Sequence, residues 1–138
     1  MRTLHYFILL FVIFQLQMCN GQTFKDFKWS NRILILTNDQ NHSHEIDLAV
    51  QDINNAKLGV QERDLKVYIL RDGKLYTTEM ELLALEPTNN LNEIQEGYIL
   101  IGKDGGIKTN KPYPLALKEL FDLIDSMPMR KSEMKSRN

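Results

Sequence analysis

The sequence predicts one α/β domain, in which a central, partly parallel sheet carries helices on both faces. Three observations lead to this prediction. Short apolar runs typical of buried strands alternate with segments whose apolar residues recur at helical spacing. The dipeptide Asp104-Gly105, a strong hairpin signal, follows one of these runs. The length of 138 residues and the apolar content of 43% suit a single compact core.

The first half of the chain contains the expected β-α-β unit. Residues 32–37 (RILILT) form a near-continuous apolar run, which indicates a strand buried on both faces. Apolar residues then recur every three or four positions, so a helix is expected over residues 43–57, with Gly59 as its stop. Residues 65–70 (LKVYIL) form the second expected strand, because they again combine β-branched, aromatic and aliphatic side chains.

The next region begins at the Asp72-Gly73 turn. Residues 74–95 show no clear period and predict one or two short helical turns around Pro87. Residues 98–101 (YILI) form a third strand, and residues 107–109 are its expected return strand in the hairpin.

A last helix is expected to begin at Pro114 and to end at Pro128. The basic sequence beyond it predicts a loose tail, and residues 135–138 are placed outside a domain of residues 22–134. The element order is strand, helix, strand, variable region, hairpin and helix. This is the thioredoxin-like arrangement, also found in peroxiredoxins, so that fold is the one we expect.

Residues 1–21 have the pattern of a secretory signal peptide. Arg2 gives a positive start, residues 6–14 are uninterruptedly apolar, and cleavage is expected after Gly21. The apolar run is shorter than the roughly 20 residues that a membrane span requires. The sequence therefore predicts a secreted or periplasmic protein without a membrane span in its mature chain.

Cys19 allows a second interpretation of this segment. A cysteine directly after an apolar run can be lipidated, which would anchor the mature protein to a membrane surface. The residues immediately before it, Gln17 and Met18, are larger than lipoprotein signals use, so removal with the signal is favoured. The mature chain then contains no cysteine.

Composition excludes several classes of function. The 17 basic and 18 acidic residues argue against an electrostatic nucleic-acid binder. A single cysteine cannot form an internal disulfide or a cysteine-rich zinc site. No cofactor motif is present: GKDGG lacks the order of a phosphate-binding loop and precedes a strand, so a tight turn explains it.

Two strings in the last third of the chain are distinctive, residues 100–108 (LIGKDGGIK) and residues 120–130 (LFDLIDSMPMR), the latter followed by Glu133. With the segments around residues 29–32 and 62–64, they resemble the peroxiredoxin-like domain of unknown function called P-DUDES. That family comprises small exported bacterial proteins and domains of animal matrix proteins such as equarin and the sushi-repeat proteins. The residues that carry the resemblance are Trp29, Arg32, Arg63, Asp64, Gly102, Lys103, Asp104, Gly105, Gly106, Asp125, Met127, Pro128, Met129 and Arg130.

The resemblance implies a thioredoxin-like fold, secretion and no established activity, and the relation to peroxiredoxins suggests an oxidoreductase. Thiol exchange needs a cysteine thiolate, normally at the end of the first strand. That place is held here by residues 38–42 (NDQNH), without a cysteine. Thiol redox catalysis is therefore not expected unless Cys19 is retained and reaches the site.

The same segment supplies the one weak candidate for a non-thiol site, formed by Asp39, His42, His44 and Glu45. Histidines can bind zinc or copper at a helix start. Two residues apart, however, the histidines point to different sides of a helix. We favour a polar helix entrance with Asn41 or Ser43 as N-cap, and predict no metal site.

Other residues admit a structural and a functional interpretation. Arg63 and Asp64 are expected to pair at the sheet edge, and such pairs are usually structural. Met127, Met129 and Met134 either form an adaptable apolar patch for a partner or complete the core face of the last helix, which we favour.

The sequence thus predicts an exported, non-enzymatic binding or envelope-interaction module, whose partner is an unidentified protein or envelope component. The alternative is a non-thiol oxidoreductase or weak metal-binding protein of the peroxiredoxin-like superfamily. The two differ in whether the side chains of residues 39–45 converge in a pocket.

Overall fold

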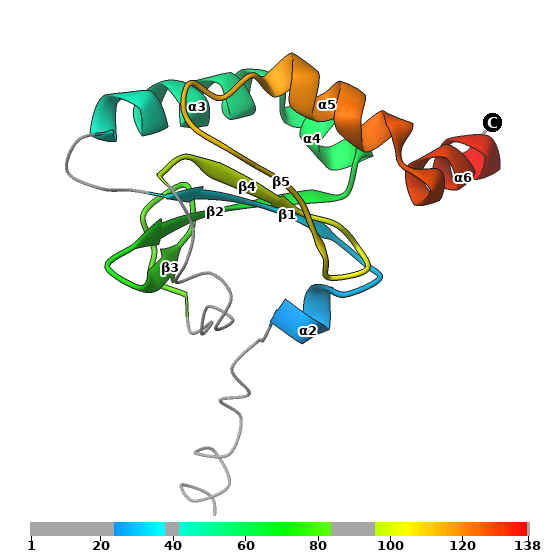
Figure 1. Ribbon diagram of the computed structural model, residues 1–138, viewed down its shortest axis with the longest axis horizontal. Helices are drawn as coiled ribbons and strands as arrows, with labels where there is room; N and C mark the ends of the chain where they lie inside the picture. Colours follow the sequence, from blue (N-terminus) through cyan, green and yellow to red (C-terminus); the bar gives the residue numbers. More distant parts are fainter. Residues whose placement is uncertain (1–23, 38–41, 84–95, 138) are drawn as a thin grey trace, which may run out of the picture.

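A computed structural model of the chain describes residues 24–37, 42–83 and 96–137 (Figure 1). These residues form a five-stranded sheet of order β3-β2-β1-β4-β5. The strands are β1 (Arg32–Thr37), β2 (Leu65–Arg71), β3 (Lys74–Tyr76), β4 (Tyr98–Ile101) and β5 (Ile107–Lys111). β1 is parallel to β2 and antiparallel to β4, while β3 and β5 are antiparallel to their neighbours. The predicted mixed α/β class is confirmed.

Helices lie on both faces of this sheet. They are α2 (Phe24–Phe27), α3 (Ser43–Asn55), α4 (Lys57–Glu62), α5 (Leu117–Ser126) and α6 (Pro128–Arg137). Figure 1 shows α3, α4 and α5 over one face, α2 on the other side, and α6 beyond the end of the sheet. Within the described ranges, no helix is long and apolar enough to cross a membrane.

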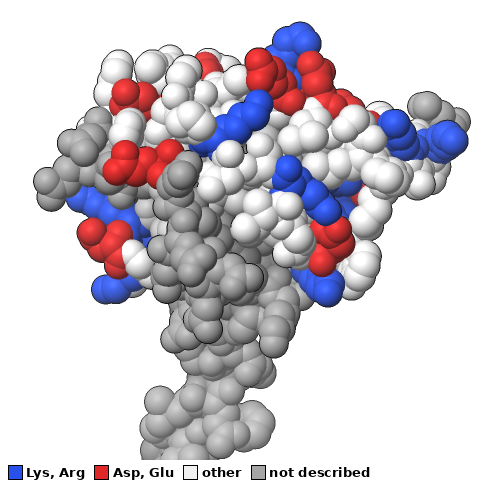
Figure 2. Space-filling view, viewed as in Figure 1, with Lys and Arg blue, Asp and Glu red and all other residues white. Residues whose placement is uncertain are grey.

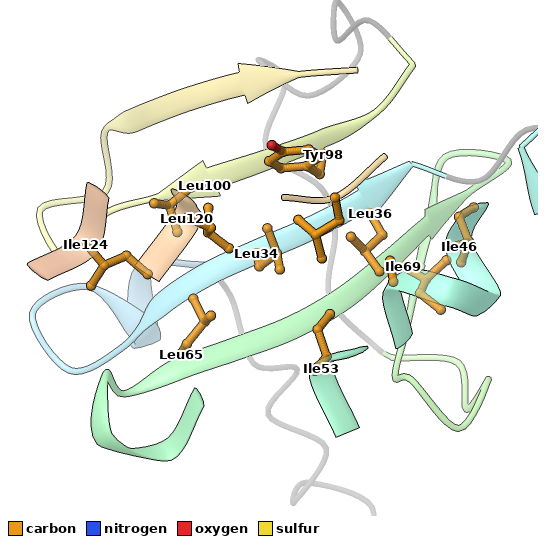
Figure 3. Close-up of a cluster of buried hydrophobic side chains, with 12 residues drawn as sticks. Leu34, Leu36, Ile46, Ile53, Leu65, Ile69, Tyr98, Leu100, Leu120 and Ile124 are labelled. Carbon is orange, nitrogen blue, oxygen red and sulfur yellow. The ribbon is translucent and has the colours of Figure 1, made fainter. Parts of the chain in front are cut away.

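The larger core lies between the sheet and the covering helices. Leu34 and Leu36 of β1 are fully buried, as is Ile124 of α5. Figure 3 shows these side chains meeting those of α3, β2 and β4 in one cluster. Their apolar positions recur every second residue on β1 and every third or fourth residue on the helices, as the buried face of each element requires.

The opposite face of the sheet has its own core, which explains why β1 is a continuous apolar run. Ile33 and Ile35 point to this side, with Tyr68, Leu75, Ile99 and Ile101. Phe27 of α2 packs here, with its ring centroid 6.0 Å from that of Tyr68. Trp29, two residues after Phe27, is 63% exposed and takes no part in this core.

The helix predicted over residues 43–57 is two helices in the structure. α3 ends at Asn55, and α4 continues the path after a break at Ala56, whose N–H donates to Asp52 and Ile53 carbonyls. Gly59 lies inside α4 and is not the stop that the sequence predicts. A Cβ at this position would lie 2.9 Å from a ring carbon of Phe121, so the glycine allows α5 to pack closely.

Residues 74–83 contain a strand instead of the expected helical turns. Asp72 and Gly73 have φ values of 49° and 71°, and they form the tight hairpin that joins β2 to β3. Tyr76 then forms an isolated bridge with Leu82. The rest of the helical prediction for this region, over residues 84–95, lies outside the described residues.

The hairpin at Asp104-Gly105 is confirmed, and its return strand runs to Lys111, two residues further than predicted. Gly105 has a φ of 83°, whereas Asp104 is not among the residues with a positive φ. Asp104 instead accepts a hydrogen bond from the Gly106 N–H at 3.0 Å. A Cβ on Gly102 would lie 2.4 Å from Lys108 Cε, so the glycine before the turn allows Lys108 to pack closely.

The C-terminal segment departs most from the prediction. α5 begins at Leu117 and not at Pro114, because the intervening Leu115 is buried in an extended segment. Pro128 does follow the end of α5, with Met127 extended before it. The residues expected to form a loose tail are the helix α6, in which Pro128 takes the first position that prolines favour.

Candidate functional site

The charged residues at one edge of the sheet form a cluster. β1 and β2 begin at this edge and β4 ends there, so residues next to these strand ends meet although they are far apart in sequence. The ends of α4 and α5 and the whole of α6 lie at the same edge (Figure 1). The ion-pair cluster, as we call it, consists of Arg32, Arg63, Asp64, Lys103, Asp125, Arg130 and Glu133.

Glu133 of α6 is the central acceptor of this cluster. Its two carboxylate oxygens accept hydrogen bonds from the two Nη atoms of Arg32, each at 3.2 Å. Lys103 Nζ lies 2.8 Å from Glu133 Oε1. Burial raises the pKa of Glu133, but the hydrogen bonds from Lys103 and Arg32 outweigh it and hold the pKa below its ordinary value. Because Arg32 is 1% exposed, α6 is fixed to the sheet by a buried charge pair.

Asp125 is the second acceptor, at the end of α5. Arg63 Nη2 donates to it at 2.5 Å and Arg130 Nε at 3.1 Å. Burial raises the pKa of Asp125, and the hydrogen bonds from Arg63 and Arg130 lower it by more. The Arg63 guanidinium also stacks 4.2 Å from the ring centroid of Phe121, a cation–π geometry. These contacts join α4, α5 and α6.

Asp64 completes the cluster but does not pair with Arg63 as the sequence predicts. Its carboxylate lies 2.8 Å from Lys103 Nζ and 3.6 Å from Arg137 of α6. The left-handed backbone of Asp64, with a φ of 48°, turns it away from its neighbour, while its carbonyl accepts the Arg32 N–H. Both residues are ion-paired, but their partners come from distant segments.

A pocket opens beside the cluster, where the turn after β4 faces the junction of α5 and α6. Its volume is about 400 Å³, and we call it the junction pocket. Its lining combines charged side chains with the apolar Met127, Pro128 and Met129. The full lining is Arg32, Gly102, Lys103, Asp104, Lys108, Met127, Pro128 and Met129.

Basic and acidic side chains are otherwise interspersed over the surface. Figure 2 shows no large area of one sign on the face it presents. Lys108 and Asp104 form an exposed pair on the rim of the junction pocket, with Nζ and Oδ2 2.6 Å apart. Hydrogen bonds from Lys108 and from the Gly106 N–H lower the pKa of Asp104. The rim pair is accessible, in contrast to the cluster.

The candidate site around residues 39–45 lies at the opposite edge of the sheet, beyond the end of β1. His42 is half-buried, with its ring centroid 5.7 Å from that of Tyr113 and Nδ1 3.7 Å from Glu96 Oε2. His44 is exposed, and Asp39 lies outside the described residues. No three His, Cys, Asp or Glu side chains in the described part of the chain are placed to hold a metal ion.

The helix entrance also differs in detail from the prediction. His42, and not Asn41 or Ser43, is the N-cap residue of α3, and it makes no side-chain capping hydrogen bond. Glu45 lies in the first turn, where a carboxylate is favourable.

The junction pocket brings together seven of the fourteen residues that carry the sequence resemblance. Of the others, Arg63, Asp64, Asp125 and Arg130 belong to the ion-pair cluster, and Gly105 and Gly106 lie in the turn. The remaining residue, Trp29, has an exposed side chain, and its backbone N–H donates to the Lys103 carbonyl at 2.6 Å. Sequence reasoning did not assign a role to Glu133, Lys108 or Arg137. One signal was present for their partners: Arg32, Asp64 and Lys103 each stand at a strand end of the same edge.

Comparison with known proteins gives one match. A model of a family described as a domain of unknown function (DUF4174) matches residues 23–133. Neither the curated proteins nor the solved structures gave a match to this chain. The matched range runs from just before α2 to Glu133 and takes in the ion-pair cluster and the junction pocket. The chain therefore belongs to the DUF4174 family.

Proposed function

We propose that the protein is an exported, non-catalytic binding module with a thioredoxin-like fold, and that the junction pocket is its binding site. The sheet order supports the fold: strands β2-β1-β4-β5, with one parallel and two antiparallel pairs, have the arrangement expected from the element order. The sequence resemblance supports the finer assignment to the P-DUDES group of peroxiredoxin-like domains.

The observation that carries this proposal is the junction pocket itself. Its volume of about 400 Å³ lies in the range of small-molecule sites, and it combines an apolar wall with a few basic groups. Its walls are held by the end of β4, by β1 and by two helices that are ion-paired to each other. A preformed, rigid pocket favours binding because little ordering is required when a ligand arrives.

Arrangement of the charges supports binding over catalysis. Each cluster carboxylate is held by two or more cations, and the pKa of both Asp125 and Glu133 is lowered. A general acid or base at neutral pH needs a carboxyl pKa shifted upward instead. The alternative of a non-thiol oxidoreductase at residues 39–45 has less support, since His44 is exposed and no group of His, Cys, Asp or Glu in the described part of the chain is placed to hold a metal ion.

A fragment screen followed by NMR on the full chain tests the proposal. We expect hits to shift the backbone amides of residues 102–108 and 127–130, and to be lost in Met129→Trp, whose larger side chain fills the pocket. The matched control is Leu58→Trp on α4, a 76% exposed position outside the pocket lining. Hits that map to the opposite edge, or turnover of peroxide or disulfide substrates, would contradict the proposal.

A further inference from the structure

We propose that the ligand of the junction pocket is a small organic oxyanion, whose carboxylate or phosphate lies against Lys103, Lys108 and the start of α6, while its apolar part contacts Met127, Pro128 and Met129. This inference rests on the proposed binding function and adds the chemical class of the ligand.

The first argument is the charge of the ion-pair cluster. Among the described residues it holds four cations, each at most 14% exposed, and three carboxylates, which are 19% to 31% exposed. Two exposed neighbours also join these ion pairs, Glu62 with Arg63 and Arg137 with Asp64. Their charges cancel, so the cluster still has one more cation than it has carboxylates. Of the charged residues that line the pocket, Arg32, Lys103 and Lys108 are cations and Asp104 is a carboxylate, so the lining itself favours an incoming anion.

The second argument is an unsatisfied donor in the pocket wall. Arg32 lines the junction pocket and is 1% exposed. Its two Nη atoms donate to Glu133 and to the Arg63 carbonyl, whereas its Nε has no acceptor within the described part of the chain. Buried donors without acceptors are rare because each costs free energy. The pocket lining thus includes a buried cation with one donor that the described part of the chain does not use.

The third argument is the position of α6. The helix is ten residues long, and its first residues, Pro128 and Met129, line the pocket. Its first intrahelical bond runs from the Lys131 N–H to the Met127 carbonyl, so the Met129 and Arg130 N–H groups precede the regular ladder. The positive end of the helix dipole favours an anion at this point. Arg32 and Lys103, which are both buried, line the same pocket, and each carries a full positive charge.

The rim of the pocket provides an exchangeable cation. Lys108 is 31% exposed and pairs with Asp104, which is 43% exposed. Exposed pairs of this kind contribute little to stability, so Lys108 can leave Asp104 for a ligand at low cost. Lys103 is held between Asp64 and Glu133, so its ammonium group keeps its position when a ligand binds. The apolar wall, with Met129 38% exposed, excludes ligands that are charged throughout.

Four probes that share a six-carbon chain test the class of ligand: hexanoate, hexyl phosphate, hexanol and hexylammonium. Each is titrated into the full chain at low salt and followed by the amide shifts of residues 102–106 and 127–130. We expect at least one of the two anions to bind tenfold or more tightly than hexanol, and hexylammonium to bind most weakly. Whichever anion binds more tightly identifies the headgroup.

Lys108→Gln separates the anion contact from pocket filling. We expect it to weaken binding of the preferred anion about tenfold and to leave hexanol binding unchanged. Lys118→Gln is the matched control, because Lys118 forms a similar i,i+4 pair on α5 but is 89% exposed and does not line the pocket. Unchanged Tm values for both variants would show that the fold is intact.

Two results would overturn the inference in distinguishable ways. If hexanol or hexylammonium shifts the pocket amides as strongly as the anions do, the pocket binds ligands but the anionic class is wrong. If all four probes leave these amides unshifted at millimolar concentration, while the domain is folded, both the anionic class and the proposed binding site fail.

Discussion

Glu133→Gln is the sharpest perturbation of this structure. The substitution keeps the shape of the side chain but removes the negative charge that both Arg32 and Lys103 contact. An amide presents one oxygen acceptor in place of two, so one Nη of Arg32 also loses its partner. The guanidinium is 1% exposed and cannot regain water without opening the domain.

The expected loss follows from these contacts. Removing one partner of a buried ion pair costs roughly 3–5 kcal/mol, because the other charge is left uncompensated. Glu133 is 19% exposed and Lys103 keeps Asp64 at 2.8 Å, so we expect the lower end. About 3 kcal/mol corresponds to a fall in Tm of roughly 12 °C for a domain of this size.

Urea unfolding of the variant and of a matched control gives the assay. Glu119→Gln removes an equally charged partner from Lys111, but these side chains are 69% and 50% exposed, so about 0.5 kcal/mol or less is expected. A double-mutant cycle of Glu133→Gln with Arg32→Gln should give a coupling of at least 1 kcal/mol. If Glu133→Gln lowers the free energy of unfolding by no more than the control Glu119→Gln does, the cluster does not fix α6 and the reasoning fails.

Three further predictions concern pH, processing and metals. The pKa values of Asp125 and Glu133 are lowered in the folded state, so the cluster contributes its full stability above about pH 4.5 and loses it as the pH falls through the folded pKa values. The urea midpoint should therefore be lower at pH 3 than at pH 7. This difference should be smaller in the Glu133→Gln variant. Mass spectrometry of the exported protein should find a chain that begins after Gly21, and a lipid on Cys19 would show the anchored form instead. Calorimetric titration with zinc should give no heat and no rise in Tm, whereas stoichiometric binding would revive the histidine pair as a metal site.

The strands could be predicted because the side chains that they bury are apolar. β1 is covered on both faces, so it stands in the sequence as a continuous run, and the Asp104-Gly105 hairpin has a local signal. β3 has three residues, too few to show a period, although the Asp72-Gly73 turn before it is an equally good hairpin signal. That signal was interpreted as the end of a strand and not as the start of its partner.

α6 could not be predicted from apolar periodicity because charge anchors it. Its buried side chain is that of Arg130, which is 5% exposed, and Glu133 provides the other fixed point. A polar, basic sequence of this kind is typical of a solvated tail, and only the positions of distant partners turn it into a packed helix. The same limit applies to the site: Arg63 and Asp125 are 62 positions apart, so their pairing depends on the fold.

The two edges of the sheet have separate roles in this fold. In a thioredoxin-like arrangement, redox chemistry belongs at the carboxyl end of the first strand, and residues 38–42, which follow Thr37 here, include no cysteine. The residues that carry the family resemblance gather at the other edge, where Arg32 begins β1 and Lys103 follows β4. Antiparallel β4 makes this possible, since it brings its carboxyl end and the following turn to the amino ends of β1 and β2. The pocket at that edge does not require a thiol at the carboxyl end of β1, which is the physical reason for seeking the function of this chain there.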